Sequence, residues 1–128
     1  MTSVALAVLV LQSQAFALSP ANVDCDQEES FPIITLAELK TELASEHKPF
    51  VVDVNGAKSF KKKHVTNAIL FESGKKLLKA LPKDKSALIV AYCGGPQCTA
   101  WHKAGKLACK NGYTNVKHFK DGIQGWVE

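Results

Sequence analysis

The chain has 128 residues, of which 46% are hydrophobic and 22% charged, and its formal net charge is +4. This composition is that of one ordinary globular domain, and it excludes a disordered or collagen-like chain. All sixteen basic residues are lysine, because the sequence contains no arginine. A basic excess this small and dispersed is typical of a solvated surface, so we expect no nucleic-acid partner.

The first seventeen residues carry no charged side chain. Residues 4–11 form a short apolar block, and Ala15-Phe16-Ala17 has the small-x-small form of a signal-peptidase site. The block is too short to span a bilayer, so we predict a signal peptide over 1–17 and no membrane attachment after cleavage. The basic residue that usually precedes the apolar core is missing, and a packed or disordered N-terminal segment is the alternative. Export, most simply to the periplasm, permits disulfides.

Residues 18–32 are polar and acidic, which predicts a linker ahead of a folded domain over 33–128. A capping box, Thr35 to Glu38, marks the start of the first helix of that domain. Apolar runs and helical spacing predict strands over 33–34, 50–54, 68–71, 87–92 and 116–119, and helices over 35–46, 57–63, 74–81 and 99–110. Strands that alternate with helices imply right-handed crossovers and a mainly parallel sheet covered on both faces.

Cys93 follows the strand predicted over 87–92, at the end of a sheet where such folds place their ligand sites. Gly94 and Gly95 let the backbone curl so that successive N–H groups face inward. The helix expected to begin near Thr99 directs its positive end into the same loop. These features stabilise a thiolate, so we predict that Cys93 is a nucleophile. A cysteine packed as a small apolar side chain at the end of a strand is the alternative.

Six motifs follow one another along the chain: ITLAEL at 34–39, VVDVN at 51–55, HVTNAI at 64–69, VAYCGGPQC at 90–98, GYTNV at 112–116 and DGIQGW at 121–126. In this order they resemble a single-domain rhodanese. The resemblance implies a sulfurtransferase with a three-layer α/β/α fold, a mainly parallel five-stranded sheet and no cofactor. It makes Cys93 the catalytic residue of an active-site loop whose other members are Gly94, Gly95, Pro96, Gln97, Cys98 and Thr99, with their N–H groups facing the bound sulfur.

The mechanism that the resemblance implies is double displacement. The Cys93 thiolate takes a sulfane sulfur from a small donor such as thiosulfate, a polysulfide or a persulfide, and passes it to a thiophilic acceptor such as a protein thiol. Residues 94–97 carry no basic side chain to hold an oxyanion. We therefore expect a polysulfide or a persulfide to be a better donor than thiosulfate. Phosphatases on a similar sheet need an arginine fork, which this chain lacks.

Three other functions use the same loop. Cys93 and Cys98 can cycle between dithiol and disulfide, or Cys98 can resolve a persulfide on Cys93 and release sulfide. The spacing C-x4-C-x3-H, completed by His102, suits copper(I) or zinc, although a histidine there is more simply solvated. A binding module without catalysis is the last alternative.

Supporting roles are predicted around the loop. Asp53 is expected to fix the turn at 55–56, and His64 to hold the loop that follows the third helix. Asn55 stands where many members of the resembled family have arginine, and it shapes the rim. Trp101 either packs beneath the loop, which we favour, or narrows its mouth.

The remaining cysteines and histidines give weaker signals. Cys109 is most simply a partly buried thiol, and Cys25 pairs either with Cys109 or with another chain. His47 and His118 are expected at the surface.

Overall fold

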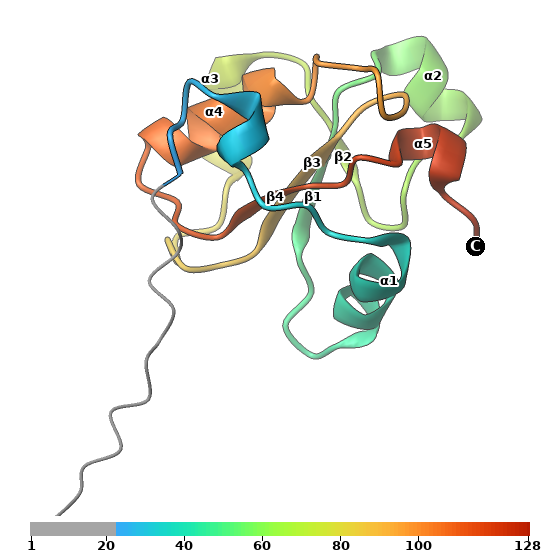
Figure 1. The fold of residues 1–128 in the computed structure, drawn as a ribbon, viewed down its shortest axis with the longest axis horizontal. Coiled ribbons are helices and arrows are strands. Elements are labelled where there is room, and N and C mark those ends of the chain that lie inside the picture. Colours follow the sequence, from blue (N-terminus) through green and yellow to red (C-terminus); the bar gives the residue numbers. More distant parts are fainter. Residues whose placement is uncertain (1–22) are drawn as a thin grey trace, which may run out of the picture.

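The computed structural model describes residues 23–128, and the signal peptide predicted over 1–17 lies outside them. The centre of the fold is a four-stranded sheet in the order β2-β1-β3-β4 (Figure 1). Its strands are β1 (Phe50–Asp53), β2 (Ile69–Leu70), β3 (Ile89–Tyr92) and β4 (Val116–His118). Each neighbouring pair is parallel, which confirms the predicted α/β class.

Five α-helices and one 3-10 helix accompany these strands within the described residues, and α2, α3 and α4 connect one strand to the next. They are η1 (Glu28–Ser30), α1 (Leu36–Ala44), α2 (Ala57–Lys62), α3 (Gly74–Ala80), α4 (His102–Lys110) and α5 (Gly122–Gly125). The predicted capping box starts α1: Glu38 N donates to Thr35 Oγ1 at 3.1 Å, and Thr35 N donates to Glu38 Oε2 at 3.0 Å. The sequence did not predict α5, because four residues are too few to show a helical period.

Two cores lie on opposite faces of the sheet. Alternate residues of β3 enter each core: Ile89 and Ala91 one, Val90 and Tyr92 the other. The first core is completed mainly by α3 and α4, and the second by α1 with side chains from α2 and α5. Because β3 is buried on both faces, its position at the centre of the molecule is fixed, and so is the loop that follows it.

The expected fifth strand is absent from the sheet of the described chain. Residues 33–34 form only a single parallel bridge, between Ile33 and His118 at the outer edge of β4. Pro32 has no N–H to donate, and Thr35 is already the N-cap of α1, so the segment has no room to extend its pairing. The sheet therefore has four strands, and the prediction of five was wrong.

The part of the expected linker that the structure describes does not separate from the domain. We call residues 23–31 the strap. Its Cys25 forms a disulfide with Cys109 of α4, with Cα atoms 5.6 Å apart. Asp26 forms ion pairs with Lys106 and Lys110 at N–O distances of 2.9 and 3.0 Å, and the hydrogen bonds from these lysines lower the pKa of Asp26 to about 2. The acidic composition that predicted a linker instead complements the lysines of α4.

Candidate active site

Cys93 follows β3 directly and is 1% exposed. The backbone around it is held by α5: Ile123 N donates to the carbonyl oxygen of Cys93, and Gln124 N to that of Gly94, both at 2.9 Å. Gly122 has φ +63°, and a Cβ atom there would lie 2.6 Å from the Cys93 carbonyl oxygen. The close approach of these two segments therefore requires glycine at position 122.

Cys93 and Cys98 form a disulfide, with Cα atoms 6.1 Å apart. This separation lies within the range of about 4.4–6.8 Å that disulfides span. The loop between them closes as a tight turn, in which Cys98 N donates to the Gly95 carbonyl oxygen at 3.0 Å. Pro96 and Gln97 are exposed at its tip. The structure therefore describes the oxidised form of the loop.

Several backbone donors of this loop remain free. Among the hydrogen bonds found within residues 23–128, the N–H groups of Gly94, Gly95, Gln97 and Thr99 donate to no acceptor. Unpaired N–H groups in a curled loop are suited to stabilise an anionic sulfur. The loop thus keeps the donors that a thiolate or a persulfide needs.

The helix after the loop begins later than predicted. Residues 99–101 form a turn, in which His102 N donates to the Thr99 carbonyl oxygen at 3.1 Å, and α4 begins at His102. Bonds to the third residue back are tighter than α-helical bonds, and they are common where a helix starts. The helix was predicted to begin at Thr99, and α4 begins three residues later.

Asp53 lies at 0% exposure beneath the site. Its Oδ1 accepts a hydrogen bond from Asn55 N at 2.8 Å, which fixes the turn after β1. Its Oδ2 accepts from the Tyr92 hydroxyl at 2.5 Å, and that hydroxyl accepts from Val65 N at 2.9 Å. Burial, and then the bond to Asp53, raise the pKa of Tyr92 above its usual value. Asp53 therefore joins the turn after β1 to Tyr92 and, through its hydroxyl, to Val65.

Asn55 and Gln124 flank the two glycines of the loop. The Oδ1 atom of Asn55 lies 3.8 Å from where a Cβ at Gly94 would be, and its Nδ2 is buried without a partner in the described structure. A Cβ at Gly95 would lie 2.5 Å from Gln124 Oε1. Gln124 was predicted only as part of the motif at 121–126 and not as a neighbour of the loop, because its contact with Gly95 depends on the unpredicted α5.

In the described part of the chain, the side chain of His64 forms no hydrogen bond with the cysteine loop. Its Nδ1 lies 2.7 Å from the Phe60 carbonyl oxygen, and its ring stacks on Phe60 with centroids 3.9 Å apart. It therefore ties the segment after α2 back to that helix.

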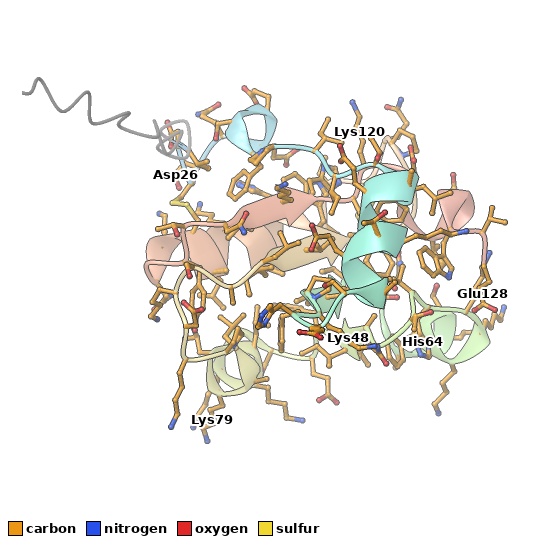
Figure 2. The ribbon with its side chains drawn as sticks, turned by 90° about the horizontal axis from the view of Figure 1, so that it is seen from below. Asp26, Lys48, His64, Lys79, Lys120 and Glu128 are labelled. Carbon is orange, nitrogen blue, oxygen red and sulfur yellow. A yellow bond between two sulfur atoms is a disulfide. The ribbon has the colours of Figure 1, made fainter. Side chains whose placement is uncertain are left out.

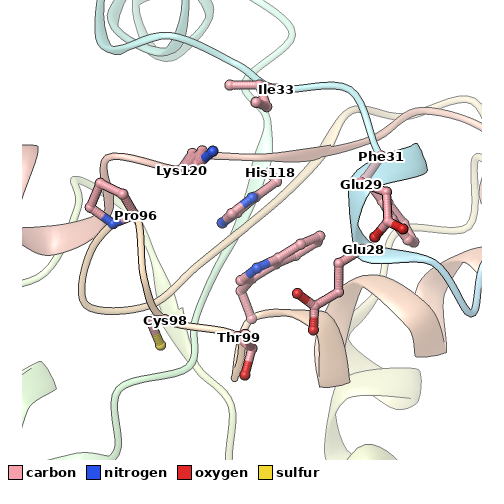
Figure 3. A pocket seen from close by; sticks show the side chains of 10 residues that line it. Glu28, Glu29, Phe31, Ile33, Pro96, Cys98, Thr99, His118 and Lys120 are labelled. Carbon is pink, nitrogen blue, oxygen red and sulfur yellow. The ribbon is translucent and has the colours of Figure 1, made fainter.

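A cavity of about 270 Å³ adjoins the loop on the side of Cys98 (Figure 3). Three segments line it: the strap and the residues after it, the cysteine loop, and the end of β4. The lining residues are Glu28, Glu29, Phe31, Ile33, Pro96, Cys98, Thr99, Trp101, His118 and Lys120. The sequence missed this cavity, because the strap was predicted to be a linker.

Two histidines predicted to be solvated are covered instead. His118 is 7% exposed and stacks on Trp101, which is 2% exposed, a burial that favours packing over a narrowing of the loop's mouth. Burial, and to a smaller extent the charge of Lys120, lower the pKa of His118 to about 4. The Nε2 atom of His102 lies 2.9 Å from the Cys25 carbonyl oxygen of the strap. Both corrections have the same cause: residues 23–33 fold over this end of the molecule.

The site does not assemble the proposed metal ligands. In residues 23–128, no group of three or more histidine, cysteine or acidic side chains is placed to hold a metal ion. Cys93 and Cys98 are bonded to each other, and His102 is turned to the strap.

In residues 23–128, no helix has the length and apolar character needed to cross a membrane.

Solved structures with this fold come from bacteria, yeast and human. The BH2092 protein from Bacillus halodurans is 28% identical, with a TM-score of 0.64 over 77% of this chain and 72% of that one. The human single-domain sulfurtransferase TSTD1 is 20% identical, with a TM-score of 0.58 over 74% of this chain and 94% of that one. The single-domain sulfurtransferase RDL2 of Saccharomyces cerevisiae is 19% identical, with a TM-score of 0.58 over 78% and 91%.

A search of curated protein sequences found no match. The family model described as "Rhodanese-like domain" matches residues 35–128, which include every strand, all five α-helices and the cysteine loop. The chain therefore belongs to the rhodanese-like domain family.

Proposed function

We propose that this protein is a sulfurtransferase that takes up a sulfane sulfur as a persulfide on Cys93. The observation that carries the proposal is the position of Cys93 at the carboxyl end of β3, in a loop whose backbone is held by α5 and keeps free N–H groups. Membership of the rhodanese-like family supports it. The sulfurtransferases TSTD1 and RDL2 have the same fold.

The first step is attack of the Cys93 thiolate on the terminal sulfur of a donor R–S–SH. A bond forms between Cys93 Sγ and that sulfur, the donor's S–S bond breaks, and RS⁻ leaves. The terminal sulfur then passes to an acceptor thiolate, which regenerates the Cys93 thiolate. Free N–H groups of the loop stabilise the persulfide anion. No cofactor takes part in either step.

The charge of the site favours an uncharged or singly charged donor. The loop residues between the two cysteines carry no cation, and the cavity beside Cys98 holds two glutamates as well as Lys120. A dianion such as thiosulfate is repelled by the glutamates. We therefore propose that persulfides, or polysulfides that carry no more than one charge, are the preferred donors.

The disulfide in the structure favours a second candidate reaction, in which Cys98 resolves the persulfide. The Cys98 thiolate attacks Cys93 Sγ, the bond to the outer sulfur breaks, and sulfide leaves as HS⁻. The pair is then oxidised, and an external thiol must reduce it before the next cycle. A plain dithiol–disulfide cycle uses the same pair without any sulfur uptake.

Intact mass after treatment with polysulfide separates these reactions. In the reduced Cys98→Ser protein, we expect a gain of about 32 Da on Cys93, because the persulfide cannot be resolved. In the wild-type protein, resolution gives released sulfide and a protein about 2 Da lighter than the dithiol. A Cys98→Ser protein that gains no sulfur, beside a wild-type protein that still oxidises, would falsify sulfur transfer and leave the dithiol–disulfide cycle.

We also propose that the protein is exported to an oxidising compartment. Two disulfides among the described residues support this location. The N-terminal sequence of the protein recovered from periplasmic and cytoplasmic fractions tests it. We expect a periplasmic form that begins at Leu18; a cytoplasmic form that retains Met1 would contradict export.

A further inference from the structure

The two sulfur atoms of the Cys93–Cys98 disulfide differ in their access to solvent. Cys93 is 1% exposed and does not line the cavity. Cys98 is partly exposed, and its side chain is part of the cavity wall (Figure 3). A thiolate that reduces a disulfide must reach the sulfur atom that it attacks. An incoming thiol therefore meets Cys98 first.

The walls of the cavity carry opposite charges. Glu28 and Glu29 belong to the strap, whereas Lys120 follows β4. Figure 3 shows Lys120 on one side of His118 and the two glutamates on the other. Because its pKa is lowered to about 4, His118 is neutral at neutral pH and adds no charge between them. A ligand with an ammonium at one end and a carboxylate at the other matches this arrangement.

The size of the cavity indicates a small molecule. Its volume of about 270 Å³ lies just below the range of about 300–1,000 Å³ that is typical of ligand pockets. Its floor is formed by the stacked rings of Trp101 and His118, against which a short aliphatic thiol can pack.

We propose that this cavity binds a low-molecular-weight thiol carrying both an ammonium and a carboxylate, and that this thiol reduces the disulfide by attack on Cys98. The proposal deepens the proposed function by naming the reductant, and it rests on that function only for the later use of the Cys93 thiolate.

The reaction balances in two steps. The thiolate RS⁻ bonds to Cys98 Sγ, the Cys93–Cys98 bond breaks, and Cys93 leaves as a thiolate beside the free N–H groups of the loop. A second RS⁻ then attacks the sulfur of R in the mixed disulfide, which gives RSSR and the Cys98 thiolate. Two thiols are oxidised for each disulfide that is reduced.

The position of the mixed disulfide tests the site of attack. The oxidised full chain is mixed with cysteine, quenched in acid at short times, denatured and treated with N-ethylmaleimide. We expect peptides with the cysteine adduct on Cys98 and the maleimide on Cys93. The reverse labelling, with the adduct on Cys93, overturns the proposal.

A series of four thiols tests the ligand class: cysteine with both charges, cysteamine with only the ammonium, 3-mercaptopropionate with only the carboxylate, and 2-mercaptoethanol with neither. Rates are compared at equal thiolate concentration and corrected for thiol basicity. We expect cysteine to react roughly threefold to tenfold faster than 2-mercaptoethanol, which is what two partly exposed ion pairs provide. Equal corrected rates for all four thiols overturn the proposal, and fast reduction by thioredoxin beside them indicates a protein reductant.

Variants of the charged residues that line the cavity provide the control. Lys120→Gln and Glu28→Gln should each reduce the preference for cysteine, whereas Lys79→Gln should leave it unchanged. Lys79 does not line the cavity, and it lies on the opposite side of the molecule from Lys120 (Figure 2). An unchanged preference in both cavity variants contradicts the proposal. No sulfur donor is present in these assays, so their outcome is independent of whether Cys93 accepts sulfur.

Discussion

His118 lies flat against Trp101, with ring centroids 3.7 Å apart and an angle of 10° between the planes. The stacked pair joins the end of β4 to the turn before α4, and it forms the floor of the cavity beside Cys98. Burial keeps the imidazole neutral in the folded protein. This contact therefore links the stability of the site to pH.

The pH dependence has a definite sign. The pKa of His118 falls from 6.5 to about 4 on folding, so the unfolded chain binds a proton more readily than the folded one. The contribution of His118 to the free energy of unfolding is fully present above about pH 6.5 and is lost as the pH is lowered toward 4. It amounts to at most about 3 kcal/mol. His118→Phe keeps the stacking and removes this contribution. Urea unfolding of both proteins between about pH 7.5 and 4.5 should show a shallower decline for the variant; parallel curves would contradict the prediction.

Loss of the disulfide between Cys25 and Cys109 should destabilise the protein more than loss of the one in the loop. The first closes a separation of 84 residues and the second a separation of 5. The loop-entropy relation gives about 4–5 kcal/mol for the first and about 2 kcal/mol for the second. Urea unfolding of Cys109→Ser and Cys98→Ser, without reductant, measures both.

Cys25→Ser is the matched control, because it removes the same disulfide from the other end. It should lose about as much stability as Cys109→Ser. A much smaller loss in either protein would mean that the strap is held by its ion pairs with Lys106 and Lys110 rather than by the disulfide.

The sequence predicted the central elements well, because they are governed by local patterns. The buried β3 is a continuous apolar run, and the capping box at Thr35 is satisfied within four residues. The position of Cys93 after β3 follows directly from that strand. These features need no knowledge of distant contacts.

The features that were missed depend on contacts between distant segments. The strap packs on α4 through a disulfide across 84 residues, and cysteine parity alone left its partner open. The burial of His118 follows from its place under residues 23–33 and cannot be read from its neighbours in sequence. The cavity combines three segments of the chain, so no single motif indicates it.

Tyr92→Phe should destabilise the fold through Asp53. The change removes the hydroxyl that donates to Asp53 Oδ2 and accepts from Val65 N, which leaves two buried groups without partners. Each unsatisfied group costs about 1–3 kcal/mol, so we expect a loss of about 2–5 kcal/mol in urea unfolding. A double-mutant cycle with Asp53→Asn tests the network, because the two side chains share the hydrogen bond and additive losses would contradict their coupling.

Gly122→Ala should damage both the stability of the protein and the chemistry of the loop. At φ +63°, alanine is strained, and its Cβ would lie 2.6 Å from the Cys93 carbonyl oxygen and from the Gly94 carbonyl carbon. Relief requires α5 to move away, which breaks the hydrogen bonds from Ile123 N and Gln124 N to the loop. We expect the Cys93–Cys98 disulfide to re-form more slowly after reduction, as measured by intact mass. We also expect the midpoint of urea unfolding to be lower.

Gly112→Ala separates backbone strain from this close approach. Gly112 has φ +90° at the end of α4, and a Cβ there meets no atom within 4 Å. Its substitution should cost about 1–2 kcal/mol of stability through strain alone. The rate of disulfide formation should be that of the wild-type protein, because α5 keeps its contacts with Cys93 and Gly94. If both glycine variants slow the formation of the Cys93–Cys98 disulfide equally, that rate responds to general destabilisation, and α5 has no positioning role.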